Sequence, residues 1–313
     1  MRLFRLHLTI STRLLFLVTV GLFEGCATSH KAAFIPKEIS FYQVGHRGTR
    51  GLMPENTIPA FEKGIAVGAN TIEFDVHITK DNKVVVYHDD SFTPAYTTLA
   101  DGSDIPAADR KKYTFYQMNY ADIRQFIIGK KYYPAFPHQH LVATYAPLLS
   151  EMIDSVEHFT TQHHYPGAIY LLEIKSSPQT DGFDQPLPES FMKILMGEMK
   201  PYLKQLKGRL IIQSFDMRPL KILHKDYPSI PLGYLTGDKS VSVQQNIDQL
   251  GFYPAFYNPQ FNLVTPELLK VCHKHGMKVL PWTVEDVKDM QRLKDMGVDG
   301  IITDYPDRFE ALD

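Results

Sequence analysis

The 313-residue sequence contains little cysteine, and its two cysteines lie far apart, at positions 26 and 272. A framework of several disulfides, as found in small secreted domains, is therefore excluded. The sequence also lacks an excess of either charge, since 33 Lys and Arg stand against 35 Asp and Glu, for a formal net charge of −2. A protein that neutralises many phosphates of a nucleic acid needs a basic surface, so this balance argues against that class. It does not exclude one phosphate bound in a pocket.

The composition is otherwise that of a globular protein, with 44% hydrophobic and 22% charged residues. Disordered, collagen-like and coiled-coil classes are excluded on these values. A chain of this length holds either two domains of ordinary size or one α/β barrel of roughly 250 residues. Composition alone does not decide between the two.

Residues 1–26 have the pattern of a signal peptide. Three arginines precede a ten-residue apolar run over residues 14–23, which is short for a membrane-spanning helix of ~20 residues. Cys26 and a small, polar stretch follow, so the segment resembles a bacterial lipoprotein signal in which the cysteine becomes the lipidated first residue. The alternatives are an ordinary cleaved signal and an uncleaved anchor. The lipoprotein hypothesis predicts a periplasmic or cell-envelope location and a membrane contact through the lipid, with a tether over residues 27–38 and a folded domain over residues 39–313.

Beyond this segment, short β-branched and aromatic stretches alternate with longer amphipathic ones, which is typical of βαβ units around a parallel sheet. Eight strands are expected at residues 41–46, 71–76, 83–88, 168–175, 209–215, 230–235, 278–283 and 300–303, with a weaker ninth candidate at 254–258. Helices are expected at residues 57–67, 148–158, 189–206, 217–226, 265–275 and 285–296. The pattern favours a TIM (β/α)₈ barrel, with a doubly wound open sheet as the alternative.

Residues 89–146 do not fit this alternation. They are rich in Tyr, Pro and charged residues and contain no long periodic run. A structureless connection of this length is uncommon inside a compact domain unless it has a function. We therefore expect an insertion or lid between strands 3 and 4 of the barrel.

Polar side chains gather at the carboxyl ends of four predicted strands, which in a barrel share one mouth. They are His46, Arg47, Glu73, Asp75, His88, Glu173 and Lys175. Residues two apart on a strand point to the same face, so Glu73 and Asp75 are expected side by side. With Glu173 they offer three oxygen ligands and no cysteine, a set that suits Ca²⁺ or Mg²⁺ better than Zn²⁺. The alternative is that these acids only pair with Arg47 and Lys175.

The two histidines can act as general base and general acid around a phosphodiester. A lone histidine is more often structural, but His46 and His88 end matching strands beside an arginine and carboxylates, which favours catalysis. Arg47 and Lys175 would hold the phosphate and offset charge in the transition state. Solvated charges at strand ends are the alternative for these two.

The ordered series of motifs resembles the glycerophosphodiester phosphodiesterase family. The motifs are Gly45-His46-Arg47-Gly48, Pro54-Glu55-Asn56-Thr57, Glu73-Phe74-Asp75, His88-Asp89, Leu172-Glu173-Ile174-Lys175, Trp282-Thr283-Val284 and residues 297–306. They extend over residues 45–307. The resemblance implies a TIM barrel that hydrolyses glycerophosphodiesters to sn-glycerol 3-phosphate and an alcohol with a divalent metal, Ca²⁺ or Mg²⁺.

The resemblance also implies a role for each matching residue. The assignments are His46 and His88 as the catalytic acid/base pair, Glu73, Asp75 and Glu173 as metal ligands, Arg47 and Lys175 as phosphate contacts, Glu55 as a support of His46 or the metal site, and Phe215 and Trp282 as the glycerol side of the substrate pocket. Asn56 is expected to stabilise its loop. For the two aromatic residues, ordinary packing inside the barrel is the alternative.

Two positions depart from the family pattern. Glu285 follows Trp-Thr-Val where the family usually has Asn, and residues 95–98 lack the Arg often found before the paired Thr. The pocket for the leaving alcohol is therefore undefined, and a related barrel phosphodiesterase acting on lysophospholipids or sphingolipids is the first alternative. A non-catalytic lipoprotein that binds headgroups is a distant one. The sequence does not determine the headgroup, the choice of Ca²⁺ or Mg²⁺, the oligomeric state, or whether water attacks directly or a cyclic phosphate forms first.

Overall fold

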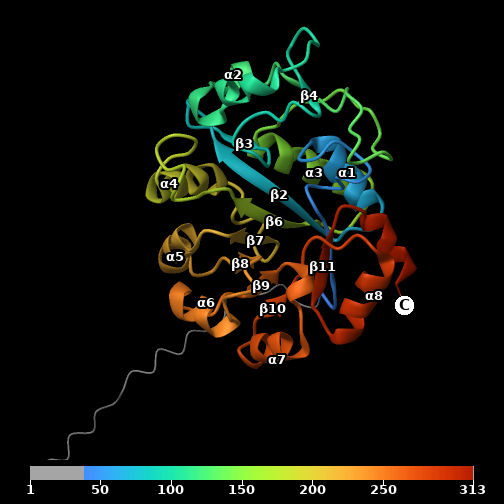
Figure 1. Ribbon diagram of the computed structural model, residues 1–313, viewed down its shortest axis with the longest axis vertical. Coiled ribbons are helices and arrows are strands. Elements are labelled where there is room, and N and C mark those ends of the chain that lie inside the picture. Colours follow the sequence, from blue (N-terminus) through green and yellow to red (C-terminus); the bar gives the residue numbers. More distant parts are fainter. Residues whose placement is uncertain (1–38, 313) are drawn as a thin grey trace, which may run out of the picture. The chain divides into compact units, whose positions relative to one another are not determined.

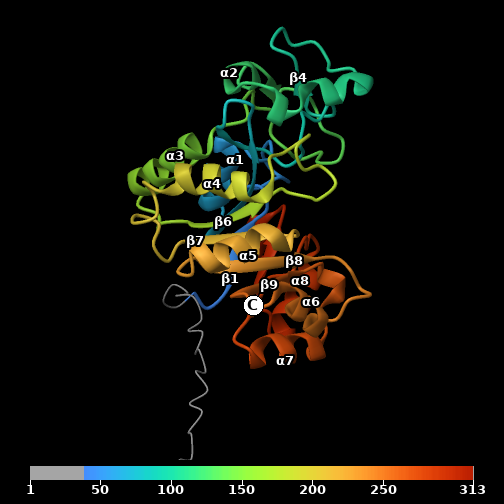
Figure 2. The same ribbon diagram turned by 90° about the vertical axis from the view of Figure 1, so that its left-hand side faces the viewer.

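The strands run through the centre of the fold with helices around them (Figures 1 and 2). The structure is a computed structural model and describes residues 39–312, so the predicted signal peptide, tether and Cys26 lie outside the described residues. Eight parallel strands follow the order β10-β9-β8-β7-β6-β2-β1-β11. Backbone hydrogen bonds from Asp299 N to Val279 O and from Ile302 N to Pro281 O, both 3.0 Å, join the two ends. The prediction of a TIM barrel is confirmed.

The barrel strands and the helices that cover them have the following bounds. The strands are β1 (Tyr42–Gly45), β2 (Thr71–Ile78), β6 (Ile169–Ile174), β7 (Leu210–Ser214), β8 (Leu232–Thr236), β9 (Phe256–Pro259), β10 (Lys278–Val279) and β11 (Gly300–Thr303). The helices are α1 (Ile58–Ala66), α3 (Leu149–Gln162), α4 (Pro188–Met199), α5 (Met217–Asp226), α6 (Val243–Leu250), α7 (Pro266–Lys274) and α8 (Val287–Met296). Between residues 39 and 312, none of the helices has both the length and the apolar character needed to cross a bilayer.

Two strands differ from the sequence prediction. Residues 83–88 contain β3 (Val84–Val86), which pairs antiparallel with the end of β2 and lies off the barrel path. A tight turn joins the two, closed by Thr79 N to Lys83 O at 2.9 Å, with Asn82 at φ 57°. The weak candidate at 254–258 is instead a barrel strand, β9. An apolar run alone does not tell a hairpin partner from a barrel strand, and here the turn between the runs decides.

Side chains alternate between the inside and the outside of the barrel along each strand. On β6, Leu171 packs in the cluster that also holds Val44 and Phe256, whereas Leu172 packs in the larger cluster under the helices. Glu173 has the same parity as Leu171 and therefore points inward. On β2, Phe74 belongs to the outer cluster, so the residues on either side of it also point into the barrel.

The predicted insertion, between β3 and α3, is a folded unit with its own small core. Because β3 lies off the barrel path, the insertion connects the second and third barrel strands, β2 and β6, and not the third and fourth. It contains a two-stranded sheet, β4 (Thr97–Thr98) with β5 (Ile127–Ile128), the short helices η1 (Ala107–Tyr113) and η2 (Phe115–Gln117), and α2 (Tyr120–Ile123). The rings of Phe92 and Phe126 stack at 4.1 Å, and Phe115 packs edge-on against Phe92 at 4.9 Å. Packing of aromatic side chains stabilises this insertion, which explains why its sequence shows no helical periodicity. The insertion lies beyond the carboxyl end of β2 (Figure 1).

Candidate active site

Three carboxylates meet inside the barrel at the ends of two adjacent strands. Glu73 and Asp75 lie on β2, and Glu173 lies on β6 as the register partner of Asp75. One oxygen of each lies within 4.8 Å of the others, and all three residues are buried. Because side chains two positions apart on a strand point to the same side, the three carboxylates meet as the sequence predicts.

Two positively charged side chains, Lys175 and Arg47, offset the three carboxylates, and Arg47 Nε lies 3.7 Å from Asp75 Oδ2. Lys175 Nζ donates to Glu173 Oε1 at 2.7 Å and lies 3.6 Å from Asp75 Oδ1. Glu73 Oε2 accepts from the backbone N of Arg47 at 2.8 Å, but within the described chain no lysine or arginine side chain forms an ion pair with Glu73. Burial, followed by the charges of Asp75 and Glu173, raises the pKa of Glu73 well above its usual range. This surplus of buried oxygen donors fits a hard divalent cation such as Ca²⁺ or Mg²⁺.

Backbone conformation shapes the loop after β1. Gly48 has φ 86°, and a Cβ atom there would lie 2.7 Å from the carbonyl carbon of Ala60, so glycine is required for close approach to α1. Arg47 and Asn56 also have positive φ values, 49° and 56°. Asn56 Nδ2 donates to Asp75 Oδ2 at 2.8 Å, so the residue expected to stabilise its own loop also orients a carboxylate of the cluster.

Glu55 lies behind Arg47 and does not line the cavity. Its Oε1 accepts from Arg47 Nη1 at 2.7 Å and from the Tyr96 hydroxyl at 3.1 Å, and its Oε2 lies 2.6 Å from Arg50 Nε. Burial alone would raise its pKa, but the charges of Arg47 and Arg50 hold the pKa of Glu55 below its usual range. Glu55 therefore pairs with two arginines, and Arg47, whose Nε lies 3.7 Å from Asp75 Oδ2, connects it to the carboxylate cluster. Among the described residues, no hydrogen bond or ion pair joins Glu55 to His46.

His46, at the end of β1, is oriented by an acid from the other end of the chain. Its Nδ1 lies 2.6 Å from Asp304 Oδ1. Because the carboxylate only accepts, Nδ1 carries the proton and Nε2 faces Glu73, 4.0 Å from Oε2. Burial lowers the pKa of His46, and Arg47 adds to this effect, whereas Asp304 opposes it. A neutral imidazole with a free Nε2 is the form that accepts a proton.

His88 has a similar arrangement after β3. Its Nδ1 lies 2.6 Å from Asp89 Oδ1, so here too the proton is on Nδ1. Its Nε2 lies 3.1 Å from Lys175 Nζ, which can only donate. Both histidines therefore present Nε2 to the same group of charged side chains.

These side chains line one cavity of about 190 Å³. Eight of the ten predicted residues within the described chain form its wall: His46, Arg47, Glu73, His88, Glu173, Lys175, Phe215 and Trp282. Phe215 and Trp282 meet edge-to-face at 5.4 Å, and Phe215 is 44% exposed, so its ring is open to a ligand. Trp282 Nε1 donates to the carbonyl of Asn258 at 2.8 Å, which fixes the indole ring.

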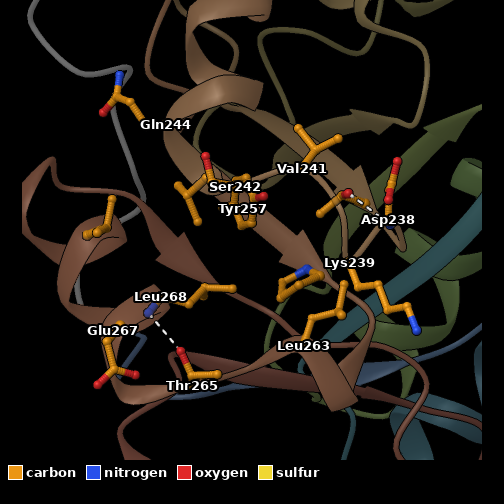
Figure 3. A pocket seen from close by; sticks show the side chains of 14 residues that line it. Asp238, Lys239, Val241, Ser242, Gln244, Tyr257, Leu263, Thr265, Glu267 and Leu268 are labelled. Atoms are coloured by element: carbon orange, nitrogen blue, oxygen red, sulfur yellow. Dashed lines mark hydrogen bonds between the residues drawn. The ribbon is translucent and has the colours of Figure 1, made fainter.

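A larger hollow of about 370 Å³ lies elsewhere, between α6 and α7. Figure 3 shows Val241, Ser242 and Tyr257 on one side of it and Leu263 and Leu268 on the other. It contains none of the predicted site residues and no histidine. Its lining gives no reason to place chemistry there, so the smaller cavity is the candidate active site.

Sequence reasoning did not assign the residues that pair with the predicted site residues. Asp304, Asp89 and Arg50 belong to this set, and Arg50 lines the cavity with its guanidinium 4.5 Å from the Phe136 ring. A signal for Asp304 was present, because it directly follows β11, whose carboxyl end opens at the same mouth.

The sequence over residues 46–308 matches the model of the glycerophosphoryl diester phosphodiesterase family. A glycerophosphodiester phosphodiesterase of Bacillus subtilis (strain 168) is 29% identical over 308 residues, covering 95% of this chain and 96% of that protein. A solved structure from Silicibacter pomeroyi DSS-3, assigned to the same family, is 31% identical with a TM-score of 0.75, covering 88% of this chain and 93% of that one. An Oleispira antarctica phosphodiesterase, solved with the product sn-glycerol-3-phosphate, shares the fold at 22% identity and a TM-score of 0.67, over 86% and 94% of the two chains.

The match covers both histidine motifs and the three carboxylates, and the barrel agrees with that of the solved relatives. The chain therefore belongs to the glycerophosphoryl diester phosphodiesterase family and is a phosphodiester hydrolase.

Proposed function

We propose that this enzyme hydrolyses glycerophosphodiesters to sn-glycerol 3-phosphate and an alcohol, with His46 and His88 as the acid/base pair. The observation that carries the proposal is that two imidazoles, each fixed by an aspartate at Nδ1, present Nε2 to one cavity that also holds three carboxylates. One histidine, in its neutral form, accepts the proton of the attacking hydroxyl at Nε2. The other must carry a proton on both ring nitrogens, and it donates its Nε2 proton to the leaving alcohol oxygen. The attacking hydroxyl is that of a water molecule or the neighbouring 2-hydroxyl of the glycerol moiety.

The positively charged groups have a separate task in this proposal. Arg47 and Lys175 line the cavity and would bind the phosphate, and their charge offsets the negative charge that develops during displacement. Glu73, Asp75 and Glu173 would hold Ca²⁺ or Mg²⁺. The metal, when bound, supplies Lewis-acid stabilisation of a phosphoryl oxygen.

The wall of Phe215 and Trp282 would pack against the carbon side of the glycerol. A cavity of about 190 Å³ favours a small, water-soluble diester over a substrate that must bury an acyl chain. The product-bound Oleispira relative supports a glycerol 3-phosphate site in a barrel of this kind. Hydrolysis of lysophospholipids, the alternative from the sequence, is an arm of the test below.

We also propose that residues 1–26 export the protein and that Cys26 carries a lipid that contacts the membrane. Export and lipid attachment are supported by the sequence, in which arginines precede the apolar run and a cysteine follows it.

The function is tested by incubating the protein with glycerophosphocholine, glycerophosphoethanolamine, glycerophosphoinositol and lysophosphatidylcholine. Each substrate is given Ca²⁺, Mg²⁺ or EDTA, and glycerol 3-phosphate and lysophosphatidic acid are measured. We expect glycerol 3-phosphate from at least one water-soluble diester, at a rate that EDTA removes. No glycerol 3-phosphate under either metal contradicts the proposal, and lysophosphatidic acid as the only product favours the alternative.

A further inference from the structure

Arg110 reaches from the insertion to one of the two aspartates that orient the histidines. It lies on η1, and its Nη2 donates to Asp89 Oδ2 at 2.7 Å. Its Nε donates to Ser91 Oγ at 3.1 Å, so the guanidinium is held at two points. Thr93 Oγ1 donates to the same Asp89 oxygen at 2.7 Å. The other oxygen, Oδ1, is thereby left to accept from His88.

These contacts matter because the Asp89 side chain is not enclosed by packing. It is 27% exposed, against 7% for Asp304, the aspartate that orients His46. A partly exposed carboxylate can rotate unless both of its oxygens are held. Two donors on Oδ2 fix the plane of the carboxylate, which fixes the hydrogen bond of Oδ1 to His88 Nδ1 and hence the direction of Nε2.

The neighbouring basic residues of η1 are directed elsewhere. Lys111 Nζ bridges Asp90 and Asp184, at 2.7 and 2.9 Å, and Lys112 Nζ pairs with Asp109 at 2.8 Å. Within the described chain, Arg110 is the one side chain of η1 that forms a hydrogen bond or ion pair with the His88 and Asp89 pair. It therefore has a role that general surface charge on the insertion does not explain.

We propose that Arg110 is a positioning residue of the active site, acting on His88 through Asp89. The insertion is then a working part of the catalytic apparatus and not only a cover over the mouth. This inference rests on the proposed function, since it takes His88 as a catalytic group.

The test compares Arg110→Ala, Arg110→Lys, Lys112→Ala, Asp89→Asn and the double variant Arg110→Ala with Asp89→Asn. With glycerophosphocholine and saturating metal, we expect Arg110→Ala to lower kcat about 10-fold with KM within about twofold, because outer contacts that orient a catalytic group have effects of this size. Arg110→Lys recovers part of the loss, and Lys112→Ala matches the wild type. In the Asp89→Asn background, removing Arg110 costs less than about twofold, because the two residues act as one unit.

The alternatives give different results. Additive losses in the double variant, or an unchanged kcat in Arg110→Ala, overturn the inference, and a change confined to KM assigns Arg110 to substrate binding instead. Nitrogen-15 NMR of the histidine rings gives a readout that needs no turnover. We expect a Nδ1–H of His88 protected from exchange in the wild type and lost in Arg110→Ala, and its retention contradicts the inference even if no diester is hydrolysed.

Discussion

Among single residues, Glu285 and Asp304 show how two close carboxyl groups take different charge states. Glu285 Oε1 accepts from the backbone N of Asp304 at 3.3 Å. Burial, followed by the charge of Asp304, raises the pKa of Glu285 from 4.5 to about 8. Asp304 stays ionised because His46 and Arg50 overcome its own burial and lower its pKa. The proton of this pair therefore resides on Glu285 at neutral pH.

The protonated state of Glu285 predicts a pH-dependent stability. The folded protein keeps this proton up to about pH 8, whereas the unfolded chain loses it near pH 4.5, so the stabilising contribution is complete below pH 4.5 and is lost as the pH rises through 8. Glu285→Gln removes the titration. We expect the free energy of unfolding of this variant to exceed that of the wild type at pH 8.5 by about 4 kcal/mol more than at pH 5, measured by urea denaturation.

The control is Glu310→Gln, at an exposed position on the C-terminal segment. Its difference from the wild type is expected to stay within about 0.5 kcal/mol at both pH values. Equal effects of Glu285→Gln at pH 5 and pH 8.5 would show that Glu285 is already ionised in the folded protein.

For single residues, the sequence predicts pairs of side chains that share one face of a strand. It does not predict pairs that lie far apart in the sequence and meet only in the folded barrel. Glu73 and Asp75 share a face because they are two apart on one strand. The pairing of His46 with Asp304 joins residues 258 positions apart. Its prediction needs the barrel to be closed first, so that β1 and β11 are neighbours.

At the scale of elements, the errors concern runs that are short or strongly polar. β9 is four residues long and contains Asn258, whose amide donates to Gln213 Oε1 inside the barrel at 2.8 Å, so its sequence looks weak although its surroundings are those of a barrel strand. Helix α6 was not predicted, although Ser242 and Gln245 form a capping box at its start. One of the four buried positions of α6 is polar, Asn246, whose amide donates to the Tyr257 hydroxyl at 2.8 Å, so few apolar residues mark this helix of eight residues.

The insertion was predicted because residues 89–146 lack the alternation of strands and helices seen elsewhere. This lack gives the position of the insertion in the sequence but not its structure. Its core is built from aromatic contacts between short turns, such as Tyr87 with Phe115 at 5.0 Å. Such contacts have no fixed spacing in sequence. Its contacts with the site, through Tyr96 and Arg110, follow from tertiary packing and were likewise outside the reach of sequence patterns.

For the N-terminal segment, the prediction that Cys26 carries a lipid can be tested by labelling. If Cys26 is lipidated, the full chain expressed in a bacterium takes up labelled palmitate and enters the detergent phase on Triton X-114 partition. Cys26→Ser is expected to lose both properties while the rate of hydrolysis per molecule is unchanged. The matched control is Cys272→Ala, since Cys272 is the other cysteine and is buried under the helices.

Two results would contradict the lipid anchor. One is incorporation of palmitate into Cys26→Ser at the level of the wild type. The other is a wild-type protein that takes up no palmitate and whose signal peptide is cleaved at a position other than the bond before Cys26.

At the scale of the whole molecule, barrel closure explains how a chain of net charge −2 makes a phosphodiester site. The segments that end β1, β2, β6 and β11 are spread over the whole domain in sequence but open at one mouth. The net charge of −2 is the sum over the whole chain, and it does not show how the charged side chains are distributed at the site. Three carboxylates inside the barrel face Arg47 and Lys175, and two aspartates fix the histidines.

The measurement that tests this account most directly is the initial rate of glycerol 3-phosphate release from glycerophosphocholine by the wild type, His46→Ala and His88→Ala at saturating metal. Removal of either general acid/base group is expected to lower kcat about 10² to 10⁴-fold. Circular dichroism and thermal unfolding of the variants should match the wild type, since both histidines lie at the cavity wall and not in the apolar core. A folded His46→Ala or His88→Ala variant with a near-normal rate would contradict the two-histidine site.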